Sequence, residues 1–303
     1  MKRRALHTVF LVIIAVMLLF PAHVNAREEP PQLFEQAMEA YARFSDNDIE
    51  SAILLLEQVI EKNPNFSPAF SALAEAYIQK YFRNLEPSPL FIEKAAAAAE
   101  KALLKDARSP QAHKALASVY YAKGMMEEAI EELERAIDMA PDYARALLNL
   151  GTCWLHLKDR ERALAFFNDA INAGNDDLAK GIAYYNLASF EAEEKKFKAS
   201  LEHYRQAAIL VPAYYGIYYG LGVVYMNLDR DRDAVGAFNE VLNLKPDYLA
   251  GHIALASAHH RLGNKESALN AYEGALNLDP ESEEAMKGLA ALKGKKIGCL
   301  FIY

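Results

Sequence analysis

The side chains that could carry out chemistry are few and scattered in this sequence of 303 residues. Its eight histidines include His252 and His259, but none has the spacing of a zinc site or of a catalytic group. The sequence has no P-loop, dinucleotide-binding or nucleophile-elbow motif. The two cysteines, Cys153 and Cys299, lie far apart and form no C-x-x-C pair. We expect no catalytic residue, no metal site and no cofactor, and we interpret His252 and His259 as packed, hydrogen-bonded helix residues.

The charge balance argues against one class of partner. Lys and Arg number 33 and Asp and Glu number 41, so the formal net charge is −8. Nucleic-acid binding needs clustered cations that neutralise phosphates, and the sequence favours a protein or peptide partner instead. Gly and Pro number only 14 and 12, and alanine and other helix-forming residues are abundant. We therefore predict an all-α protein.

A pattern of small and large apolar residues recurs with a period of about 34 residues. Leu150-Gly151 precedes Trp154 by the same spacing that separates Leu221-Gly222 from Tyr225. Nine positions after each aromatic site stands a small residue, namely Ala129, Ala163, Ser200, Ala234 and Ala268. A proline usually closes the unit, at Pro141, Pro212, Pro246 and Pro280. Because apolar residues three and four apart share one helix face, each unit predicts two helices packed together.

This pattern resembles the tetratricopeptide repeat (TPR), a family of helical hairpins. The resemblance covers residues 33–282 and implies a right-handed superhelical solenoid of seven TPR hairpins, followed by a capping helix over 283–293. The predicted repeats span 33–66, 67–109, 110–143, 144–180, 181–214, 215–248 and 249–282. The second repeat is longer than the period and includes Glu86-Pro87-Ser88-Pro89, which predicts a longer loop between its helices. The fourth is also longer and has no closing proline.

The resemblance also implies a binding groove on the concave face, which the first helix of each hairpin lines. The candidates for binding a partner lie on the stripe opposite the core: Lys114, Tyr121, Arg145, Leu148, Asn149, Thr152, Tyr185, Asn186, Ser189 and Tyr219. Asn149 and Asn186 share one repeat position, where some family members bind a peptide backbone; two solvated amides are the alternative. The clamp for a terminal carboxylate in chaperone-binding members is not expected, because Ile182 and Asn186 replace its last two basic residues.

The N-terminus is typical of an export signal. A basic start, Lys2-Arg3-Arg4, precedes an apolar stretch from Thr8 to Phe20, and small residues lead up to Ala26. We predict a signal peptide over 1–26, cleaved between Ala26 and Arg27, and a linker over 27–32. The apolar stretch is shorter than the roughly 20 residues of a membrane-spanning helix. The expected location is the periplasm or the exterior; an uncleaved anchor in the inner membrane is the alternative.

The last ten residues, 294–303, form a predicted apolar tail that ends at Tyr303. Two interpretations stay open: the tail folds back onto the final helix, or it docks to a partner or a membrane surface. Membrane contact is expected only through this tail or an uncleaved N-terminus.

For the whole chain we predict a non-catalytic scaffold for protein–protein interaction in a cell-envelope complex. The alternatives are an accessory subunit of an envelope assembly or of a polysaccharide or secretion enzyme complex, and a self-assembling array. The sequence specifies neither the partner nor the oligomeric state.

Overall fold

The computed structural model describes residues 30–83, 88–174 and 176–294. These residues form fifteen α-helices, α2 to α16, and no strand, which confirms the predicted all-α class. The predicted signal peptide with its cleavage site lies outside the described residues, and so does nearly all of the apolar tail, residues 295–303. Within the described ranges, no helix is both long and apolar enough to cross a membrane.

The helices pack as successive antiparallel pairs. The first helices of the pairs are α2 (Pro30–Arg43), α4 (Ser67–Arg83), α6 (Pro110–Ala122), α8 (Ala144–His156), α10 (Asp177–Glu193), α12 (Tyr215–Asn227) and α14 (Leu249–Arg261). The second helices are α3 (Asp46–Lys62), α5 (Pro89–Lys105), α7 (Met126–Met139), α9 (Arg160–Asn172), α11 (Phe197–Leu210), α13 (Asp231–Leu244) and α15 (Lys265–Leu278). Helix α16 (Glu283–Leu292) follows the last pair and packs on α14 and α15.

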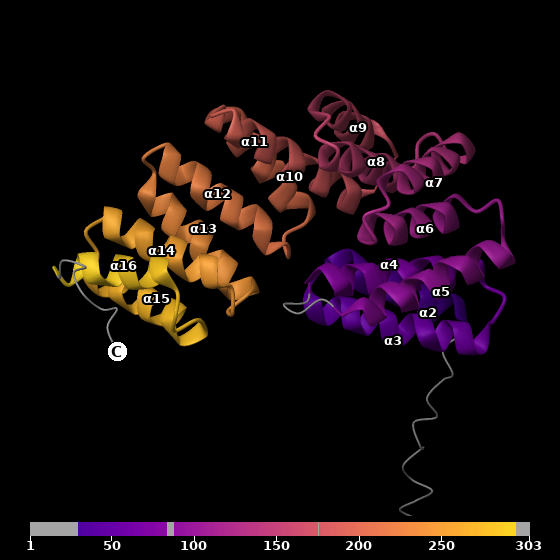
Figure 1. Ribbon diagram of the computed structural model, residues 1–303, viewed down its shortest axis with the longest axis horizontal. Helices are drawn as coiled ribbons and strands as arrows, with labels where there is room; N and C mark the ends of the chain where they lie inside the picture. Colours follow the sequence, from indigo (N-terminus) through magenta and orange to yellow (C-terminus); the bar gives the residue numbers. More distant parts are fainter. Residues whose placement is uncertain (1–29, 84–87, 175, 295–303) are drawn as a thin grey trace, which may run out of the picture.

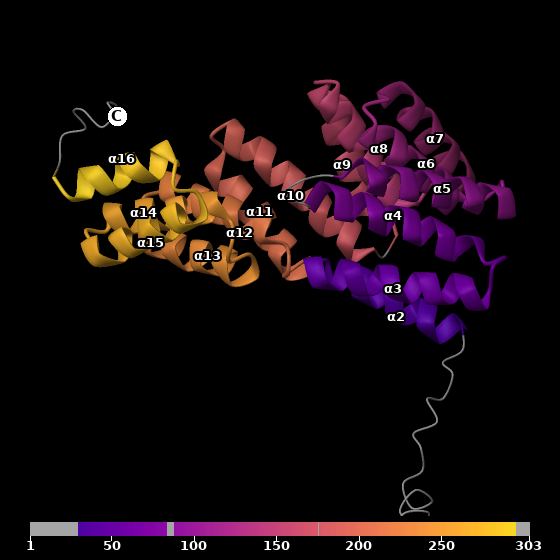
Figure 2. The ribbon, with the colours of Figure 1, turned by 60° about the horizontal axis from the view of Figure 1, so that its bottom comes forward.

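The stack of pairs is curved. Figure 1 shows an arch with α2 to α9 in one arm and α11 to α16 in the other, and Figure 2 shows the same arch turned. Each first helix contacts the first helix of the next pair, whereas successive second helices make no comparable contact in the described part of the chain. The first helices therefore form the shorter, inner side of the arch, and their outward-facing stripe lines its hollow.

Close contact within each pair depends on small residues. The positions predicted to be small, such as Ala163 and Ala234, are 0% exposed. On α12, a methyl group added to Gly222 would lie 2.3 Å from the ring of Phe238 on α13. The small size of the side chains at these positions lets the two backbones approach, and the large rings fill the space beside them.

Two helices begin earlier than predicted. Helix α2 begins at Pro30, so residues 30–32 of the predicted linker are helical. Helix α10 begins at Asp177 rather than near Gly181, because Asp176 caps the helix by accepting a hydrogen bond from the Ala179 amide. The additional residues of the fourth repeat thus extend a helix. In the second repeat, α4 ends at Arg83 and α5 begins at Pro89, so residues 84–88 connect them; this connection is longer than 123–125 between α6 and α7, as was predicted.

The turn between α2 and α3 contacts the opposite arm. Phe44 in this turn is buried, has a φ of 59° and packs edge-on against Tyr214, with ring centroids 5.6 Å apart. Arg83 lies 4.0 Å from the centroid of the Phe44 ring and 2.8 Å from Asp46, and Lys245 reaches Asp46 at 3.8 Å. We call these five residues the clasp. It joins the first pair of helices to the region of α12 and α13.

Candidate functional site

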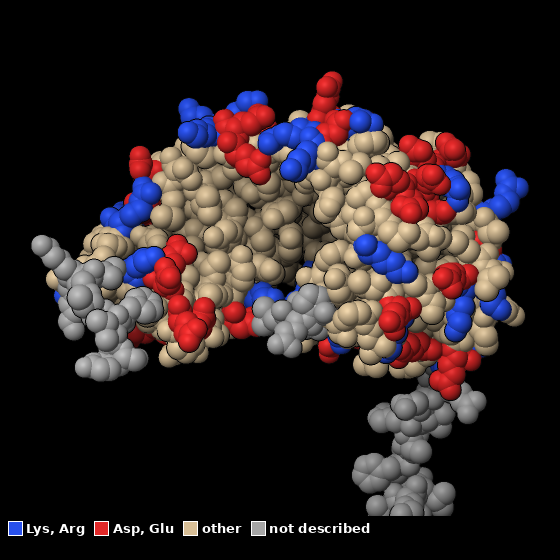
Figure 3. Space-filling model, viewed as in Figure 1, with Lys and Arg blue, Asp and Glu red and all other residues tan. Residues whose placement is uncertain are grey.

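A cavity of about 220 Å³ lies on the inner side of the arch, between α2, α4, α6, α8 and α10. Six of the ten candidate residues line it: Lys114, Tyr121, Arg145, Leu148, Asn149 and Thr152. A second cavity of about 250 Å³ shares part of this lining, namely Tyr41, Glu75, Lys114 and Arg145. Figure 3 shows that Lys, Arg, Asp and Glu gather on the outer rim, whereas the hollow between the arms shows few of them. The charged groups in the cavities are therefore an exception on this wall.

One of these charged groups belongs to a buried ion pair. Lys114 on α6 is 4% exposed, and its Nζ lies 2.5 Å from Oε2 of Glu75 on α4. Burial lowers the pKa of Lys114 although the Glu75 carboxylate favours its charged form. The second carboxylate oxygen, Oε1 of Glu75, is buried without a hydrogen-bond partner among the described residues. Lys114, a candidate on the predicted groove stripe, thus lines the cavity with its charge already paired to a carboxylate from α4.

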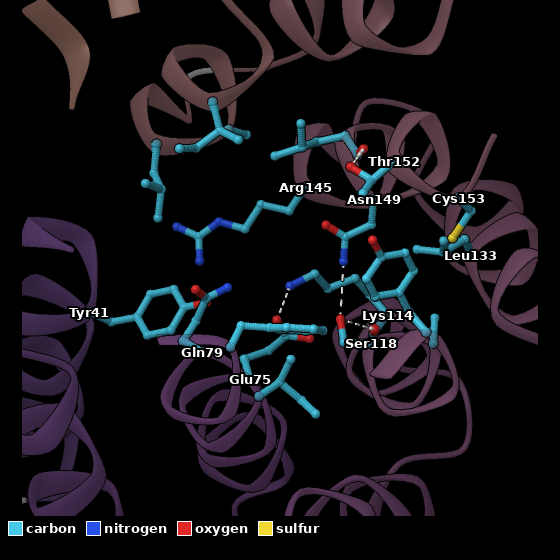
Figure 4. Close-up of a pocket in the computed structure, with 18 of the residues that line it drawn as sticks. Tyr41, Glu75, Gln79, Lys114, Ser118, Leu133, Arg145, Asn149, Thr152 and Cys153 are labelled. Atoms are coloured by element: carbon cyan, nitrogen blue, oxygen red, sulfur yellow. Dashed lines mark hydrogen bonds and ion pairs between the residues drawn. The ribbon is translucent and has the colours of Figure 1, made fainter. Parts of the chain in front are cut away.

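Arg145 on α8 makes the second ion pair. Its Nε lies 2.5 Å from Oδ2 of Asp176, the residue that caps α10. Burial opposes the charge of Arg145, but the neighbouring Asp176 and Tyr41 outweigh it and raise its pKa. Figure 4 shows the guanidinium extending into the cavity toward Tyr41, whose ring centroid is 5.5 Å from its Cζ. Because Asp176 contacts Nε, the Nη hydrogens of Arg145 are left for another acceptor.

Two uncharged polar residues of the cavity, Asn149 and Thr152, differ in the hydrogen-bonding groups that they leave free for a partner. Asn149 donates a hydrogen bond of 3.1 Å from its Nδ2 to Oγ of Ser118 (Figure 4), and its side-chain carbonyl oxygen stays available as an acceptor. The hydroxyl of Thr152 donates to the Leu148 carbonyl at 3.0 Å within the helix. Of the two, Asn149 is the better placed to bind a partner.

The structure separates the other four candidates from the cavity: Tyr185, Asn186, Ser189 and Tyr219. Tyr185 packs against Tyr214 with ring centroids 5.2 Å apart, and Tyr219 packs against Phe238 at 5.9 Å. These tyrosines hold neighbouring helices together. Asn186 is partly buried and does not line the cavity, so only one of the two asparagines of the expected ladder lies there.

Among the cavity residues that sequence reasoning missed are three polar ones, Tyr41, Glu75 and Gln79. The predicted groove residues all lie in repeats three to six. Tyr41 and Glu75 stand at the ninth position of the predicted repeats that begin at Leu33 and Ser67, and Ser118 has the same position in the third. Following the stripe into the first two repeats would have identified Tyr41 and Glu75.

His252 and His259 are both partly buried and hydrogen-bonded, in agreement with the packing interpretation. Nε2 of His252 lies 2.9 Å from the carbonyl oxygen of Pro246, which fixes the ring at the start of α14. Within the described ranges, no three His, Cys, Asp or Glu side chains are grouped as metal ligands would be.

Comparison with protein families agrees with the resemblance found in the sequence. Four models, each described as a tetratricopeptide repeat, match residues 91–142, 120–182, 215–248 and 249–292. Together they cover more than half of the chain. They leave the first predicted repeat and nearly all of the fifth, 181–214, unmatched, so the count of seven repeats stays a prediction.

Curated relatives share only the repeat region. Superkiller protein 3 of Schizosaccharomyces pombe is 23% identical over 232 residues, which are 71% of this chain and 16% of that protein. The human protein O-mannosyl-transferase TMTC3 is 24% identical over 219 residues, 70% of this chain and 22% of that protein. This chain thus spans less than a quarter of the length of these relatives.

Solved structures share the fold. A chain of the APC/C hetero-tetramer Cut9-Hcn1 matches with a TM-score of 0.64 and 16% identity, over 94% of this chain and 52% of that chain. PilF of Pseudomonas aeruginosa matches with a TM-score of 0.61 and 20% identity, over 74% and 97%. PilW, a type IV pilus biogenesis factor, matches with a TM-score of 0.58 and 20% identity, over 74% and 98%. At these identities the likeness establishes the helical solenoid alone.

Proposed function

Because this chain belongs to the tetratricopeptide repeat family, we propose that it is a non-catalytic scaffold that binds a segment of a partner protein on its inner wall. TPR domains in general bind protein or peptide partners. The observation that carries the proposal is the cavity between α2, α4, α6, α8 and α10, which six of the predicted groove residues line. Concave sites with mostly apolar walls and a few convergent polar groups are typical of binding sites.

The surroundings of the cavity suit a protein partner. Phe82, which lines the cavity, is 51% exposed, and its ring centroid lies 5.9 Å from that of Tyr121. Partly exposed aromatic rings beside buried polar groups are common in protein interfaces, because rings supply large contact areas at a small entropic cost. A partner segment would cover these two rings and extend polar groups toward Arg145 and Asn149.

Site-specific photocrosslinking tests this proposal. Benzoylphenylalanine is placed at Gln79 or Thr152, which line the cavity, and at Asn168, which is exposed on α9 outside it. We expect a crosslinked partner from the two cavity positions and none from Asn168. The variant Phe82→Ala should weaken the binding of that partner in isothermal titration. Equal crosslinking from all three positions would contradict the proposal.

For the cellular location, we propose export to the cell envelope, which the order of basic start, apolar stretch and small residues before Arg27 supports. Sequencing the N-terminus of the protein isolated from cell fractions tests this step. Arg27 at the N-terminus in the periplasmic or secreted fraction is the expected result. A chain that retains Met1 in the membrane fraction would instead support the uncleaved anchor.

A further inference from the structure

The cavity contains hydrogen-bonding groups that the protein itself does not satisfy. Oε1 of Glu75 is buried without a partner among the described residues, and Glu75 lines both cavities. A buried carboxylate oxygen without a donor costs free energy. A ligand that supplies a hydrogen-bond donor at this oxygen would remove that cost. Gln79 also lines the cavity, and its amide makes no hydrogen bond within the described part of the chain. The cavity therefore presents an unmet acceptor and an amide with free donors and a free acceptor.

The cavity also contains hydrogen-bond donors that have no acceptor among the described residues, namely the Nη groups of Arg145. The ion pair of Arg145 with Asp176 uses Nε and leaves the two Nη groups, which extend into the cavity in Figure 4. An occupant that satisfies both sides needs an N–H group for Glu75 and a carbonyl for Arg145.

The charges of the site exclude a charged occupant. Glu75 pairs with Lys114, and Arg145 pairs with Asp176, so the four formal charges cancel. A carboxylate on the ligand would face the free oxygen of Glu75, and an ammonium or guanidinium group would face Lys114 and Arg145. Because like charges repel at such short distances, either approach is unfavourable. An uncharged group with both a donor and an acceptor meets neither repulsion.

We propose that this cavity recognises the primary carboxamide of a Gln or Asn side chain that an extended partner segment inserts. The carboxamide nitrogen donates to Oε1 of Glu75, and its carbonyl oxygen accepts from Nη of Arg145. A carboxamide has two donors and one acceptor on a planar group, whereas a hydroxyl has a single donor and satisfies the two sides less completely. Phe82 and Tyr121 contact the residues on either side of the inserted one. This inference rests on the proposed function, and it adds the specificity of the site.

A peptide array identifies the preference. Nonapeptides with flanks of mixed Ala, Ser, Pro and Tyr carry one fixed central residue: Gln, Asn, Glu, Lys or Leu. The tightest Gln peptide and its matched Glu, Lys and Leu versions are then titrated by fluorescence anisotropy against the full chain. We expect the Gln peptide to bind about tenfold or more tightly than each of the others, because each of them leaves a buried group unpaired.

Variants of the protein connect the preference to the cavity. Glu75→Gln removes the negative charge, so the Glu peptide should gain relative to the Gln peptide by about tenfold. Glu50→Gln, an exposed carboxylate that pairs with Lys80, is the matched control and should leave the ranking unchanged. If melting curves show that Glu75→Gln does not fold, Gln79→Ala serves instead: it removes an amide of the cavity wall that can hydrogen-bond an inserted carboxamide, so it should weaken the Gln peptide severalfold while the Leu peptide is unaffected.

The outcomes separate this inference from the proposed function. Equal binding of the Gln and Leu peptides, with loss of both in Phe82→Ala, would keep the inner wall as a binding surface and overturn the carboxamide site. Tightest binding of the Glu or Lys peptide would overturn it in favour of a charged ligand. No binding of any peptide, together with no crosslinking at Gln79, would overturn both. An unchanged ranking in Glu75→Gln would show that the preference arises elsewhere.

Discussion

At the scale of single residues, two glycines on neighbouring helices have opposite surroundings. A methyl group at Gly222 would lie 2.3 Å from the ring of Phe238, which is fully buried, whereas nothing lies within 4 Å of the same position at Gly236. We expect Gly222→Ala to destabilise the protein by about 1–3 kcal/mol, since a packed ring must move. Gly236→Ala should stabilise it by roughly 0.5–1 kcal/mol, because alanine favours the helix. Urea unfolding measures both; equal effects would show that the contact at Gly222 is not close.

Buried titratable side chains make the stability depend on alkaline pH. Burial raises the pKa of Cys153 to about 12 and that of Tyr204 to about 12, above their ordinary values of 9.0 and 10.0. Between these values the unfolded chain loses protons that the folded chain keeps. The stabilising contribution is therefore complete below pH 9 and is lost as the pH rises toward 12, by roughly 1 kcal/mol per pH unit for each group. Urea midpoints at pH 8.5, 10 and 11 should fall, and less steeply in Tyr204→Phe; a flat profile would contradict this prediction.

At the scale of the helix, the repeat pattern assigns one face of α9 to the contact with α8. Ala163 is 0% exposed on that face, and Ala165 two positions later is exposed. We expect Ala163→Asp to destabilise the protein by about 3–5 kcal/mol, because an unpaired charge would be buried in a close helix contact. Ala165→Asp is the matched control and should change stability by less than about 0.5 kcal/mol. Thermal melts of the two variants that coincide would refute the predicted register.

At the scale of the whole molecule, the clasp distinguishes a closed arch from an open one. Phe44 and Tyr214 join parts of the chain that the stack of helices alone would leave free to move apart. We expect Phe44→Ala to separate the two arms and raise the radius of gyration in small-angle X-ray scattering, with a lower melting temperature. Phe82→Ala removes a ring that is 51% exposed and should leave the scattering unchanged. Identical scattering from wild type and Phe44→Ala would show that the arch closes without the clasp.

The sequence by itself determined the helices, their pairing and the stripe that lines the inner wall. The reason is that hairpin packing is local: Ala163, Phe167 and their counterparts in other repeats lie close in the chain to the residues they contact. Six of the ten candidate residues came together because they share that stripe on two neighbouring helices. The helix start at Asp177 was missed because the Asp176 cap outweighed the repeat period.

Only the tertiary structure decided what closes the site. The carboxylate of Glu75 buries Lys114, and Phe44 reaches Tyr214 across a separation of many repeats. Such contacts depend on the small rotation between successive hairpins, which accumulates along the stack. The accumulated rotation is a property of the whole stack and cannot be deduced from the sequence of one repeat. A residue pattern with a period of about 34 therefore predicts which side chains face inward. The accumulated curvature determines which of those side chains meet.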